Sequence, residues 1–553
     1  MSCKVIIIGG VAGGASTAAR LRRLNEKAEI IIIERGDYIS YANCGLPYYI
    51  GGAIEERDSL LVMTPRQFKE RLNIEVRVKN EALKIERDKK EIVIKDIKEN
   101  SEYKETYDYL VLSPGAEPLR PPLPGIDNPG IFSLRTIPDT DRIYNYISEN
   151  KPKNAVVVGA GYIGLEMIEN LKHQGLDVTV VELAPHVLPP IDADIAALVQ
   201  QYLRDQGVNL KLADGVKEFH QSDRGNNVEL NSGETMEAEL VLLSIGVKPD
   251  IKLAKEAGLA TDRGIKVNEF MQTSDPTIYA LGDAVEVTNL VTNKPAIIPL
   301  GGPANKQGRI AANNIAGKKD TYRGTQGTSV LKIFDMTMSM TGANERLLAS
   351  ENIDFQSIII HSHDHATYYP NAKPLTLKVL FDQGGNLLGA QAFGHSGVEK
   401  RIDVIATALR TGKTIYDLQE LELAYAPPYS SAKDPVNIAG FVAGNILEGF
   451  YKTINAANLI EIKTSKNVQV LDVRDAEEHE EARIEGSINI PLNSLRKHLG
   501  ELDREKDIIT YCSVGLRSYL ATRILAQNGF DRVRNLNGGF KVYQAYFNEL
   551  SKK

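Results

Sequence analysis

The chain has 553 residues, of which 42% are hydrophobic and 25% charged, and its formal net charge is -7. This length exceeds what one hydrophobic core usually supports, so we expect several globular domains and no extensive disorder. The mild charge, without a basic stripe interleaved with aromatic residues, argues against nucleic acid or an anionic membrane as a partner.

Cysteine content and apolar runs indicate the compartment. Three cysteines are too few for a disulfide scaffold, so we expect reduced thiols with chemical roles, except for Cys3, which we expect to be inert. The longest apolar runs are too short and too rich in glycine to span a bilayer, and the chain enters a predicted strand without a signal segment. The sequence therefore predicts a cytoplasmic location.

Two segments of the chain repeat the same order of predicted elements. Residues 3–34 and 154–183 each read as a strand, a glycine turn, a helix and a second strand, which is how a dinucleotide-binding unit begins. Clusters of proline and glycine at 113–125 and 244–250 bracket the second unit. They indicate that it is inserted into the first.

The second glycine turn carries the complete dinucleotide-binding pattern. Gly159, Gly161 and Gly164 form G-x-G-x-x-G before a predicted helix, and Glu182 closes the following strand. Glycines let the backbone approach a pyrophosphate, the helix N-terminus favours its charge, and the carboxylate accepts a hydrogen bond from a ribose hydroxyl. Because Glu182 would also repel a ribose 2′-phosphate, the sequence predicts NADH over NADPH. The alternative is a packed glycine turn without a ligand.

The first glycine turn departs from this pattern. Gly9, Gly13 and Gly14 are present and Glu34 ends the next strand, but Val11 stands where the second glycine is expected. From the motif alone, a nucleotide site and a structural turn are both open.

Asp283 gives this turn its context. It follows a predicted strand and a glycine in DPTIYALGDA, where a carboxylate can bind a ribityl or ribose hydroxyl. Together with YDYLVLSPGAEP, the two turns and this segment resemble the two-dinucleotide-domain flavoprotein disulfide reductases over roughly residues 1–445. The resemblance implies FAD on the first unit.

Cys44 stands alone in SYANCGLPY. Relatives that resemble glutathione reductase carry a C-x4-C redox pair, whereas a single thiol must cycle through a mixed disulfide, a persulfide or a sulfenic acid. The run resembles that of the coenzyme A disulfide reductases and of the related NADH oxidases and peroxidases. The peroxidases have a histidine before the glycine pair of the first turn, where this chain has Ala12, which argues against peroxide as substrate.

A basic helix face points to coenzyme A. Arg20 and Arg23 share a face at i and i+3, although a solvated face is the alternative and is what we expect for Arg22. In the coenzyme A disulfide reductases, these two positions, with Ser16, Ser40 and Asn43, contact the coenzyme A nucleotide. The resemblance therefore implies a coenzyme A site.

Two later segments, HATYYPNAKPL and LAYAPPYSSAKDP, also resemble that family. The resemblance implies that Tyr368 and Tyr425 reach the partner subunit's active cysteine, that Lys433 contacts substrate, and that the protein is a homodimer. A phenol could donate a proton to a departing coenzyme A thiolate, although most tyrosines in proline-rich runs are simply packed.

The C-terminal block has its own signature. Cys512 follows a strand-like run and opens the loop CSVGLR, in which backbone N–H groups, the next helix and Arg517 would stabilise a thiolate or an anionic sulfur group. With LDVRDAEE, EGSINIPL and NLNGGF, the block resembles a rhodanese domain over about 455–550. The loop is shorter than the C-x5-R cradle of tyrosine phosphatases, and Ser513 replaces the basic residue usual in thiosulfate-using rhodaneses. An inactive rhodanese fold is the alternative.

The predicted fold class is therefore α/β, with two Rossmann-like dinucleotide-binding domains, an α+β dimerisation domain and a C-terminal α/β rhodanese domain. The expected boundaries are 1–112 and 246–325 for the FAD domain, 113–245 for the NAD domain, 326–452 for the dimerisation domain and 453–553 for the rhodanese domain.

The fusion as a whole resembles the rhodanese-linked coenzyme A disulfide reductases, which are also described as NADH-dependent persulfide reductases. The resemblance implies FAD-dependent reduction by NADH of coenzyme A persulfide, polysulfide or disulfide at Cys44, with Cys512 passing on sulfane sulfur and no metal. Three alternatives stay open: coenzyme A disulfide as the main substrate, an NADH oxidase or peroxidase, and a rhodanese block that is a passive carrier or docking module.

Overall fold

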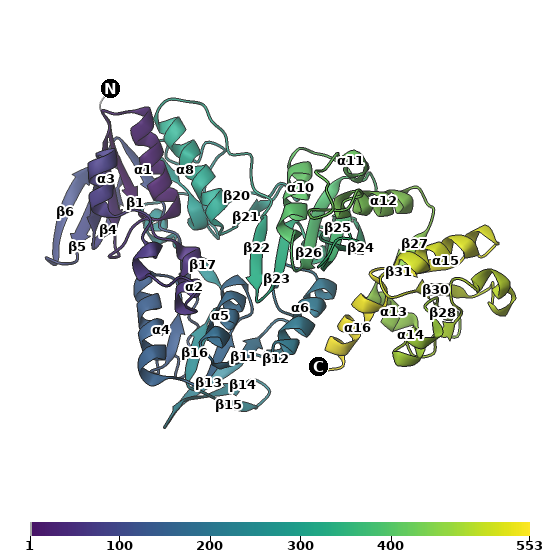
Figure 1. Ribbon diagram of the computed structural model, residues 1–553. Helices are drawn as coiled ribbons and strands as arrows, with labels where there is room; N and C mark the ends of the chain where they lie inside the picture. Colours follow the sequence, from purple (N-terminus) through teal and green to yellow (C-terminus); the bar gives the residue numbers. More distant parts are fainter. Residues whose placement is uncertain (1–2, 553) are drawn as a thin grey trace. The chain divides into compact units, whose positions relative to one another are not determined.

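The computed structural model describes residues 3–552 and divides into two compact units. Unit 1 comprises the chain up to Val181 together with Gly215–Gly327, and unit 2 comprises Glu182–Asp214 together with the chain from Thr328 onward. Figure 1 labels their helices and strands.

The first parallel sheet of unit 1 has the strand order β19-β7-β1-β2-β3. Its strands are β1 (Lys4–Ile8), β2 (Glu29–Glu34), β3 (Glu75–Val78), β7 (Tyr109–Leu112) and β19 (Ile278–Ala280). Residues Val5, Ile6 and Ile7 of β1 are fully buried on both faces, as expected for an inner strand of a parallel sheet. Helices α1 (Ala12–Leu24) and α8 (Gly301–Ile315) pack against each other. Because β19 pairs with β7, the chain returns to this sheet after building a second one.

In the second parallel sheet, β11 (Asp177–Glu182), β10 (Asn154–Val158), β16 (Leu240–Leu243) and β9 (Ile131–Ser133) pair in that order. Helix α5 (Tyr162–His173) follows β10, and α4 (Ile137–Asn150) follows β9. The smaller elements of unit 1 are η1 (Asn43–Gly45), α2 (Leu46–Ile50), η2 (Arg57–Leu60), α3 (Pro65–Leu72), β4 (Asn80–Glu86), η3 (Arg87–Lys89), β5 (Glu91–Asp96), β6 (Ser101–Thr106), β8 (Ala116–Pro118), β13 (Val216–Ser222), β14 (Gly225–Leu230), β15 (Thr235–Ala238), β17 (Val247–Pro249), α7 (Lys252–Glu256), β18 (Ile265–Lys266), η4 (Gly282–Ala284), β20 (Val285–Thr288) and β21 (Pro295–Ala296).

Unit 2 contains an antiparallel sheet with the order β22-β23-β26-β25-β24. Its strands are β22 (Ser329–Ile333), β23 (Met336–Gly342), β24 (Gln356–His363), β25 (Pro374–Phe381) and β26 (Leu387–Gly394). The other elements before the last domain are α6 (Ala193–Asp205), β12 (Asn209–Leu212), α9 (Glu345–Ser350), α10 (Val398–Arg410), α11 (Ile415–Glu420) and α12 (Pro435–Leu447). Fully buried Lys378 of β25 forms ion pairs with Asp194 of α6 at 2.8 Å and with Glu345 of α9 at 2.8 Å, which tie both helices to the sheet.

The C-terminal part of unit 2 is a parallel sheet in the order β27-β31-β30-β28-β29. Its elements are β27 (Lys452–Ile454), α13 (Ala456–Ile462), β28 (Val468–Asp472), α14 (Ala476–Glu481), β29 (Ile488–Asn489), η5 (Leu495–Lys497), η6 (Leu499–Glu501), β30 (Asp507–Tyr511), α15 (Leu516–Gln527), β31 (Val533–Leu536) and α16 (Gly539–Leu550). Neighbouring residues Ile508 and Ile509 belong to separate apolar clusters because successive side chains of a strand point to opposite faces.

Two side chains, those of Asn537 and His361, join this C-terminal sheet to β24, the last strand of the antiparallel sheet. The side chain of Asn537 accepts a hydrogen bond from Ile359 N at 2.7 Å and donates one to Ser357 O at 3.1 Å. His361 Nε2 lies 3.0 Å from Gly538 O. Burial lowers the pKa of His361 to about 3, so this ring is neutral.

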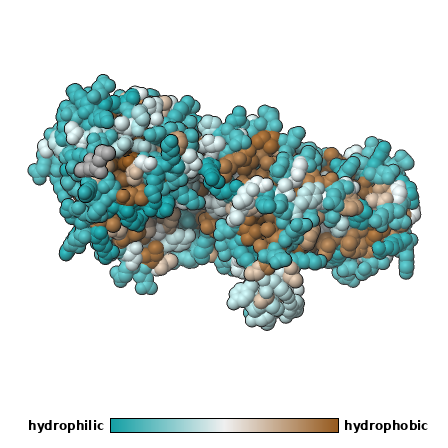
Figure 2. Space-filling view, turned by 90° about the horizontal axis from the view of Figure 1, so that it is seen from above, coloured by the Kyte–Doolittle hydropathy of each residue, from teal (hydrophilic) through white to brown (hydrophobic). Residues whose placement is uncertain are grey.

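No helix among residues 3–552 is long and apolar enough to cross a membrane. Hydrophilic residues cover most of the face seen in Figure 2, and hydrophobic residues show between them.

Candidate active sites

The first glycine turn packs closely against its own sheet. Gly9 has φ +92°, and a Cβ on it would lie 2.1 Å from Ser113 O. A Cβ on Gly14 would lie 1.9 Å from Gly9 O, and one on Gly13 would lie 2.3 Å from Leu281 Cδ1. Gly9 and Gly14 are therefore required by backbone packing, whatever they bind, whereas the Leu281 side chain could move to accept a Cβ on Gly13. Glu34 at the end of β2 accepts a hydrogen bond from Gly10 N at 2.9 Å.

The second glycine turn differs at its central position. Gly159 has φ +98° and Gly164 would place a Cβ 2.1 Å from Gly159 O, so both serve packing. An added Cβ on Gly161 meets nothing within 4 Å, and the backbone there is extended, so neither packing nor conformation requires a glycine. The open space beside Gly161 fits a bound phosphate group at the start of α5. Glu182 is the last residue of β11, and its carboxylate accepts a hydrogen bond from Ala184 N at 2.7 Å.

Asp283 lies in η4. Burial raises the pKa of its carboxyl, and Arg135 opposes the shift. Among residues 3–552, none donates a hydrogen bond to this carboxylate, so it is available to a hydroxyl of a bound flavin nucleotide. The residues at the first turn and at Asp283 fit the predicted cofactor.

Cys44 is exposed within η1, directly before α2. Desolvation raises the pKa of its thiol, and the nearby carboxylates of Glu166 and Asp283 raise it further. Cys44, Glu166 and Asp283 thus lie close enough to act on one another electrostatically. The protein alone does not activate this thiol as a thiolate.

Glu166, which the sequence motifs do not mark, lies near Cys44. This carboxyl lies on α5, and Tyr48 donates a hydrogen bond to its Oε1 at 3.4 Å. Burial raises the pKa of Glu166 to about 7, against the lowering effect of the Tyr48 bond. Its place one helical turn after Tyr162 could have marked it, because i and i+4 side chains lie on the same helix face as the glycine turn.

The predicted coenzyme A residues lie around α1. Ser16 donates a hydrogen bond to Asn305 of α8, and Arg20 Nε donates one to Asn313 of the same helix at 2.9 Å. Arg23 and Asn43 are exposed. Ser40 has φ +46°, a left-handed backbone that a serine adopts at a cost.

The expectation for Arg22 is wrong. This side chain is only 5% exposed and donates hydrogen bonds to five backbone carbonyls, those of Leu72, Asn25, Glu26, Ala28 and Asn73. A buried guanidinium requires such acceptors, and the ends of three elements supply them. Arg22 therefore fixes the end of α1 and is not part of a solvated basic face.

In unit 2 the predicted tyrosines meet. Tyr368 and Tyr425 are both exposed, and their hydroxyls lie 2.6 Å apart. This hydrogen bond raises the pKa of Tyr368. Lys433 is exposed and precedes Asp434, the N-cap of α12. The two phenols thus form a hydrogen-bonded pair on the surface of the unit.

Cys512 lies between β30 and α15 and is only 1% exposed. Its Sγ accepts hydrogen bonds from Gly515 N at 3.1 Å and from Ser518 Oγ at 3.5 Å. Gly515 has φ +106°, which turns its N–H toward the sulfur. The structure thus places the sulfur at the start of α15, within reach of a backbone N–H group.

Arg517 is not free to face the sulfur. Its two terminal nitrogens donate to Glu478 at 2.6 and 2.8 Å, and Nη2 also donates to Ser513 Oγ at 3.1 Å. The hydrogen bond to Glu478 raises the pKa of Arg517, with a smaller contribution from Cys512. The predicted anion-stabilising residue is held in an ion pair that spans 39 positions of sequence.

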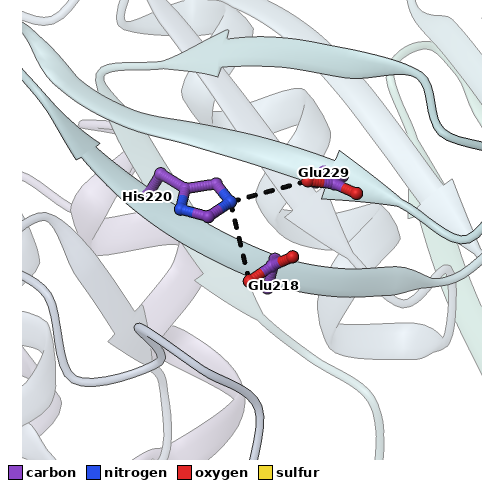
Figure 3. Close-up of side chains that lie close together, drawn as sticks. All are labelled: Glu218, His220 and Glu229. Carbon is purple, nitrogen blue, oxygen red and sulfur yellow. Dashed lines mark ion pairs between the residues drawn. The ribbon is translucent and has the colours of Figure 1, made fainter.

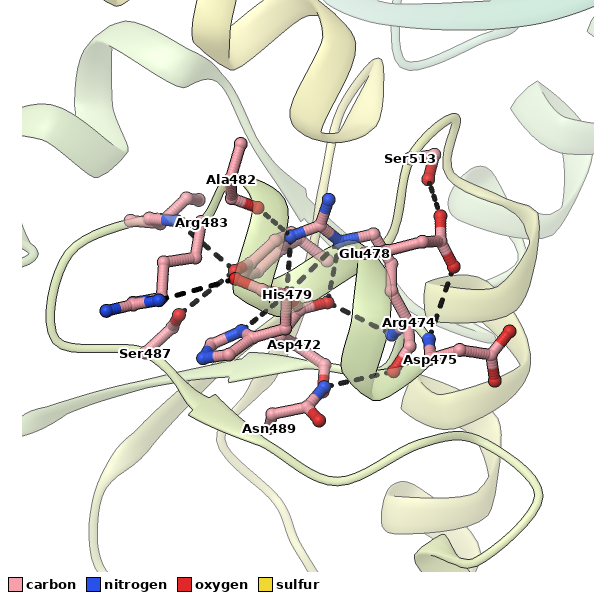
Figure 4. A network of polar contacts seen from close by, with 12 residues as sticks. Asp472, Arg474, Asp475, Glu478, His479, Ala482, Arg483, Ser487, Asn489 and Ser513 are labelled. Carbon is pink, nitrogen blue, oxygen red and sulfur yellow. Dashed lines mark hydrogen bonds and ion pairs between the residues drawn. The ribbon is translucent and has the colours of Figure 1, made fainter.

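Beside this ion pair lies a buried network (Figure 4). Asp472 is fully buried and accepts hydrogen bonds from Arg474 Nη2 at 2.6 Å and from His479 Nδ1 at 2.9 Å. The Arg474 guanidinium lies 4.4 Å from the Phe540 ring centre. The network is saturated within the protein, and we assign it to holding α14 on the sheet.

A further ionisable group lies on the β13–β14 hairpin (Figure 3). Glu218 and Glu229 face each other across the strands, and His220 Nε2 lies 3.6 and 3.5 Å from their carboxylates. Lys217 also pairs with Glu229 at 2.6 Å. Because two like charges opposite each other destabilise a hairpin, we assign Lys217 and His220 to relieving that repulsion.

Comparison with known proteins gives the class. Residues 3–301 match the family model described as pyridine nucleotide-disulphide oxidoreductase, and residues 455–546 match the rhodanese-like domain. The chain therefore belongs to the pyridine nucleotide-disulphide oxidoreductase family and carries a C-terminal rhodanese domain. This membership confirms the α/β fold class and the prediction of an oxidoreductase that uses FAD and a pyridine nucleotide.

Individual relatives are similar over most of their length. An NADH oxidase of Methanocaldococcus jannaschii is 38% identical over 79% of this chain and 97% of the relative. A coenzyme A disulfide reductase of Staphylococcus haemolyticus is 37% identical over 80% of this chain and 100% of the relative.

Two solved structures cover nearly the whole chain. The reduced CoADR-RHD of Bacillus anthracis is 49% identical, covers 99% of both chains and has a TM-score of 0.97. An NAD-dependent persulfide reductase from A. fulgidus is 39% identical, covers 98% of this chain and 100% of its own, and has a TM-score of 0.92. The order of domains is thus shared with both proteins.

Proposed function

We propose that this protein is a homodimeric, cytoplasmic flavoenzyme that uses NADH to reduce coenzyme A persulfide, polysulfide or disulfide at Cys44, while its rhodanese domain handles sulfane sulfur at Cys512. The observation that carries the proposal is the state of the thiols: Cys3, Cys44 and Cys512 are all free. Only Cys44 is exposed and lies near the carboxylates that flank the predicted flavin site. The names of the full-length structural neighbours support the same chemistry.

The Cys44 thiolate attacks the inner sulfur of coenzyme A persulfide, so that a Cys44–coenzyme A disulfide forms and hydrosulfide leaves. With coenzyme A disulfide as the substrate, the leaving group is coenzyme A thiolate instead. Gly9, Gly13, Gly14, Glu34 and Asp283 would hold FAD, which would supply the electron pair, taken from NADH, that is needed to reduce the mixed disulfide. The nicotinamide nucleotide is held at Gly159, Gly161, Gly164 and Glu182.

The substrate is positioned by Ser16, Arg20, Arg23, Ser40, Asn43 and Lys433. The hydrogen-bonded pair of Tyr368 and Tyr425 donates a proton to the departing coenzyme A thiolate across the dimer interface. Within the rhodanese domain, Cys512 accepts sulfane sulfur and passes it on as a persulfide, and Arg517 orders its loop.

A second candidate is an NADH oxidase that acts through a Cys44 sulfenic acid, and the archaeal relative favours it. The two are separated by measuring NADH oxidation and hydrosulfide release with coenzyme A persulfide, glutathione persulfide, coenzyme A disulfide, peroxide and oxygen. The proposal requires hydrosulfide in proportion to NADH with the persulfide. Fast NADH oxidation by oxygen or peroxide with no sulfur compound would establish the oxidase instead. Cys44→Ser is expected to abolish the sulfur-dependent reaction, and retained activity would exclude Cys44 as the nucleophile.

A further inference from the structure

The loop that holds Cys512 has an acidic neighbour. Ser513 Oγ donates a hydrogen bond to Glu478 Oε1 at 2.7 Å (Figure 4). Arg517 forms a two-pronged ion pair with the same carboxylate, at 2.6 and 2.8 Å. Glu478 therefore contacts two of the residues that follow Cys512, one by a hydrogen bond and the other by a full ion pair.

We infer that Glu478 sets the donor specificity of the rhodanese domain: it occupies Arg517 and so disfavours the dianion thiosulfate relative to donors of lower charge. This inference deepens the proposed function and rests on it, since it concerns the sulfur that Cys512 accepts. Glu478 acts through Arg517 and is thus a positioning residue.

The loop that follows Cys512 carries one positive charge, and two acidic residues lie beside it. In the loop itself Ser513, Val514, Gly515 and Leu516 are uncharged, so Arg517 is its one cation. Glu478 neutralises that cation, and Asp475 lies 3.4 Å from it as a second anion. The Arg517 pair lowers the pKa of Glu478 to about 2, so the carboxylate keeps its charge throughout the working pH range.

Another cation, Lys541, lies behind the loop. It lines a cavity of about 400 Å³ together with Ser513, Val514 and Phe540, but Cys512, Glu478 and Arg517 do not line that cavity. Desolvation lowers the pKa of Lys541, so its ammonium group is less favoured and it is a poorer partner for an anionic donor than Arg517. Arg517, which follows Cys512 on α15, is therefore the cation that matters for the donor, and Glu478 is its ion-pair partner.

The chemistry makes charge the deciding factor. When the Cys512 thiolate attacks the outer sulfur of thiosulfate, the S–S bond breaks, sulfite leaves with the electron pair, and a Cys512 persulfide remains. Methanethiosulfonate reacts in the same way but is a monoanion, and methanesulfinate leaves. Both steps conserve atoms and electrons. An unpaired guanidinium attracts a dianion about twice as strongly as a monoanion, so the pairing of Arg517 with Glu478 removes more attraction from thiosulfate than from methanethiosulfonate.

The test compares these two donors on the full chain in a Cys3→Ser, Cys44→Ser background, in which Cys512 is the remaining thiol. Sulfur transfer to cyanide gives kcat/KM for each donor, and intact mass verifies that one sulfur atom is added. The parent protein is expected to prefer methanethiosulfonate. Glu478→Gln is expected to shift the ratio of the two kcat/KM values toward thiosulfate by about tenfold, mainly through KM. Glu478→Asp retains the charge and is expected to keep the preference.

Glu477→Gln is the matched control, because Glu477 lies on the same helix, is exposed and removes the same charge without touching Arg517. An unchanged ratio in Glu478→Gln would overturn the inference. So would a parallel loss with both donors, which indicates a structural role, or no sulfur loading from either donor. Since the assay uses neither NADH nor Cys44, its outcome is separate from failure of the proposed reductase, which is measured as NADH oxidation by the unmodified chain.

Discussion

Glu166 brings a carboxyl with a pKa of about 7 into the electrostatic environment of Cys44. Above that pH the carboxylate is charged and opposes formation of the thiolate. The reactivity of Cys44 is therefore coupled to the ionisation of a residue on α5, the helix that begins at the second glycine turn.

Replacing Glu166 tests this coupling. Glu166→Gln removes a negative charge near the thiol, so the pKa of Cys44 is expected to fall. The pH profile of iodoacetamide alkylation, followed at Cys44 by peptide mass, should move to lower pH. Glu149→Gln, on an exposed turn of α4, is the control that should leave the profile unchanged. An unshifted profile in Glu166→Gln would show that the charge of Glu166 does not raise the pKa of Cys44.

In the second glycine turn, an alanine at the central position and one at an outer position should have different effects: the first should weaken NADH binding, and the second should destabilise the fold. Gly161→Ala should fold normally, since its Cβ meets nothing within 4 Å, yet it should raise KM for NADH about tenfold by filling the phosphate space. Gly164→Ala should lower the melting temperature instead, because its Cβ would lie 2.1 Å from Gly159 O. Thermal unfolding together with NADH kinetics on both variants separates the two effects, and a destabilised Gly161→Ala would contradict the assignment.

At the scale of elements, the junction between β24 and the C-terminal sheet depends on a neutral histidine. In the folded chain the pKa of His361 is about 3, well below the ordinary value of about 6.5, so protonation favours the unfolded state. The stabilisation by neutral His361 is complete above pH 6.5 and is lost as the pH falls toward 3.

We therefore expect the free energy of unfolding in urea to fall by about 1 kcal/mol between pH 6.5 and 5.5 from this residue alone. His361→Gln, which cannot titrate, should flatten that part of the pH dependence. His363→Gln, an exposed position on the same strand, should leave the pH dependence as it is. Equal slopes in all three proteins would show that His361 does not control it.

Elements with a strong local pattern could be predicted from the sequence. The runs at β1 and β10 are short, apolar and followed by glycine turns, so both βαβ units were expected where the structure has them. The rhodanese loop was likewise placed correctly between a strand and a helix.

Long-range polar contacts could not be predicted. Arg22 was misjudged because two of its acceptors lie 50 and 51 positions away, and helical periodicity does not reveal them. Glu478 was missed because an acidic residue on a short, charged helix looks like any solvated position until the fold brings it to Arg517. Glu166 was missed because burial, not motif, makes its pKa unusual.

At the scale of the whole molecule, the proposed dimer makes each active site a product of two chains. Cys44 from one protomer and the tyrosine pair from the other would then act together, and this arrangement can be tested by complementation between subunits. Mixing two inactive variants should restore function if their intact parts meet.

The complementation test uses Cys44→Ser and the double variant Tyr368→Phe with Tyr425→Phe, refolded or coexpressed in equal amounts. Half of the dimers are then mixed, and each contains one intact site, so about a quarter of the original turnover should return. If cysteine and tyrosines act within one chain, no activity should return. A monomer by light scattering would exclude the arrangement altogether.

The hydrogen bonds from Asn537 to Ile359 and Ser357 have a consequence for anyone who divides this protein. β24 is an edge strand, and unpaired backbone groups along such an edge are a template for intermolecular strand addition. The rhodanese domain covers part of that edge with the side chain of Asn537, whose carbonyl and amide groups bond to β24 in place of a neighbouring strand. A reductase fragment cut near residue 452 would uncover it and is expected to self-associate in a concentration-dependent way, which sedimentation velocity would reveal. If that result is obtained, the C-terminal domain has a second role besides sulfur transfer, which is to protect the neighbouring sheet from aggregation.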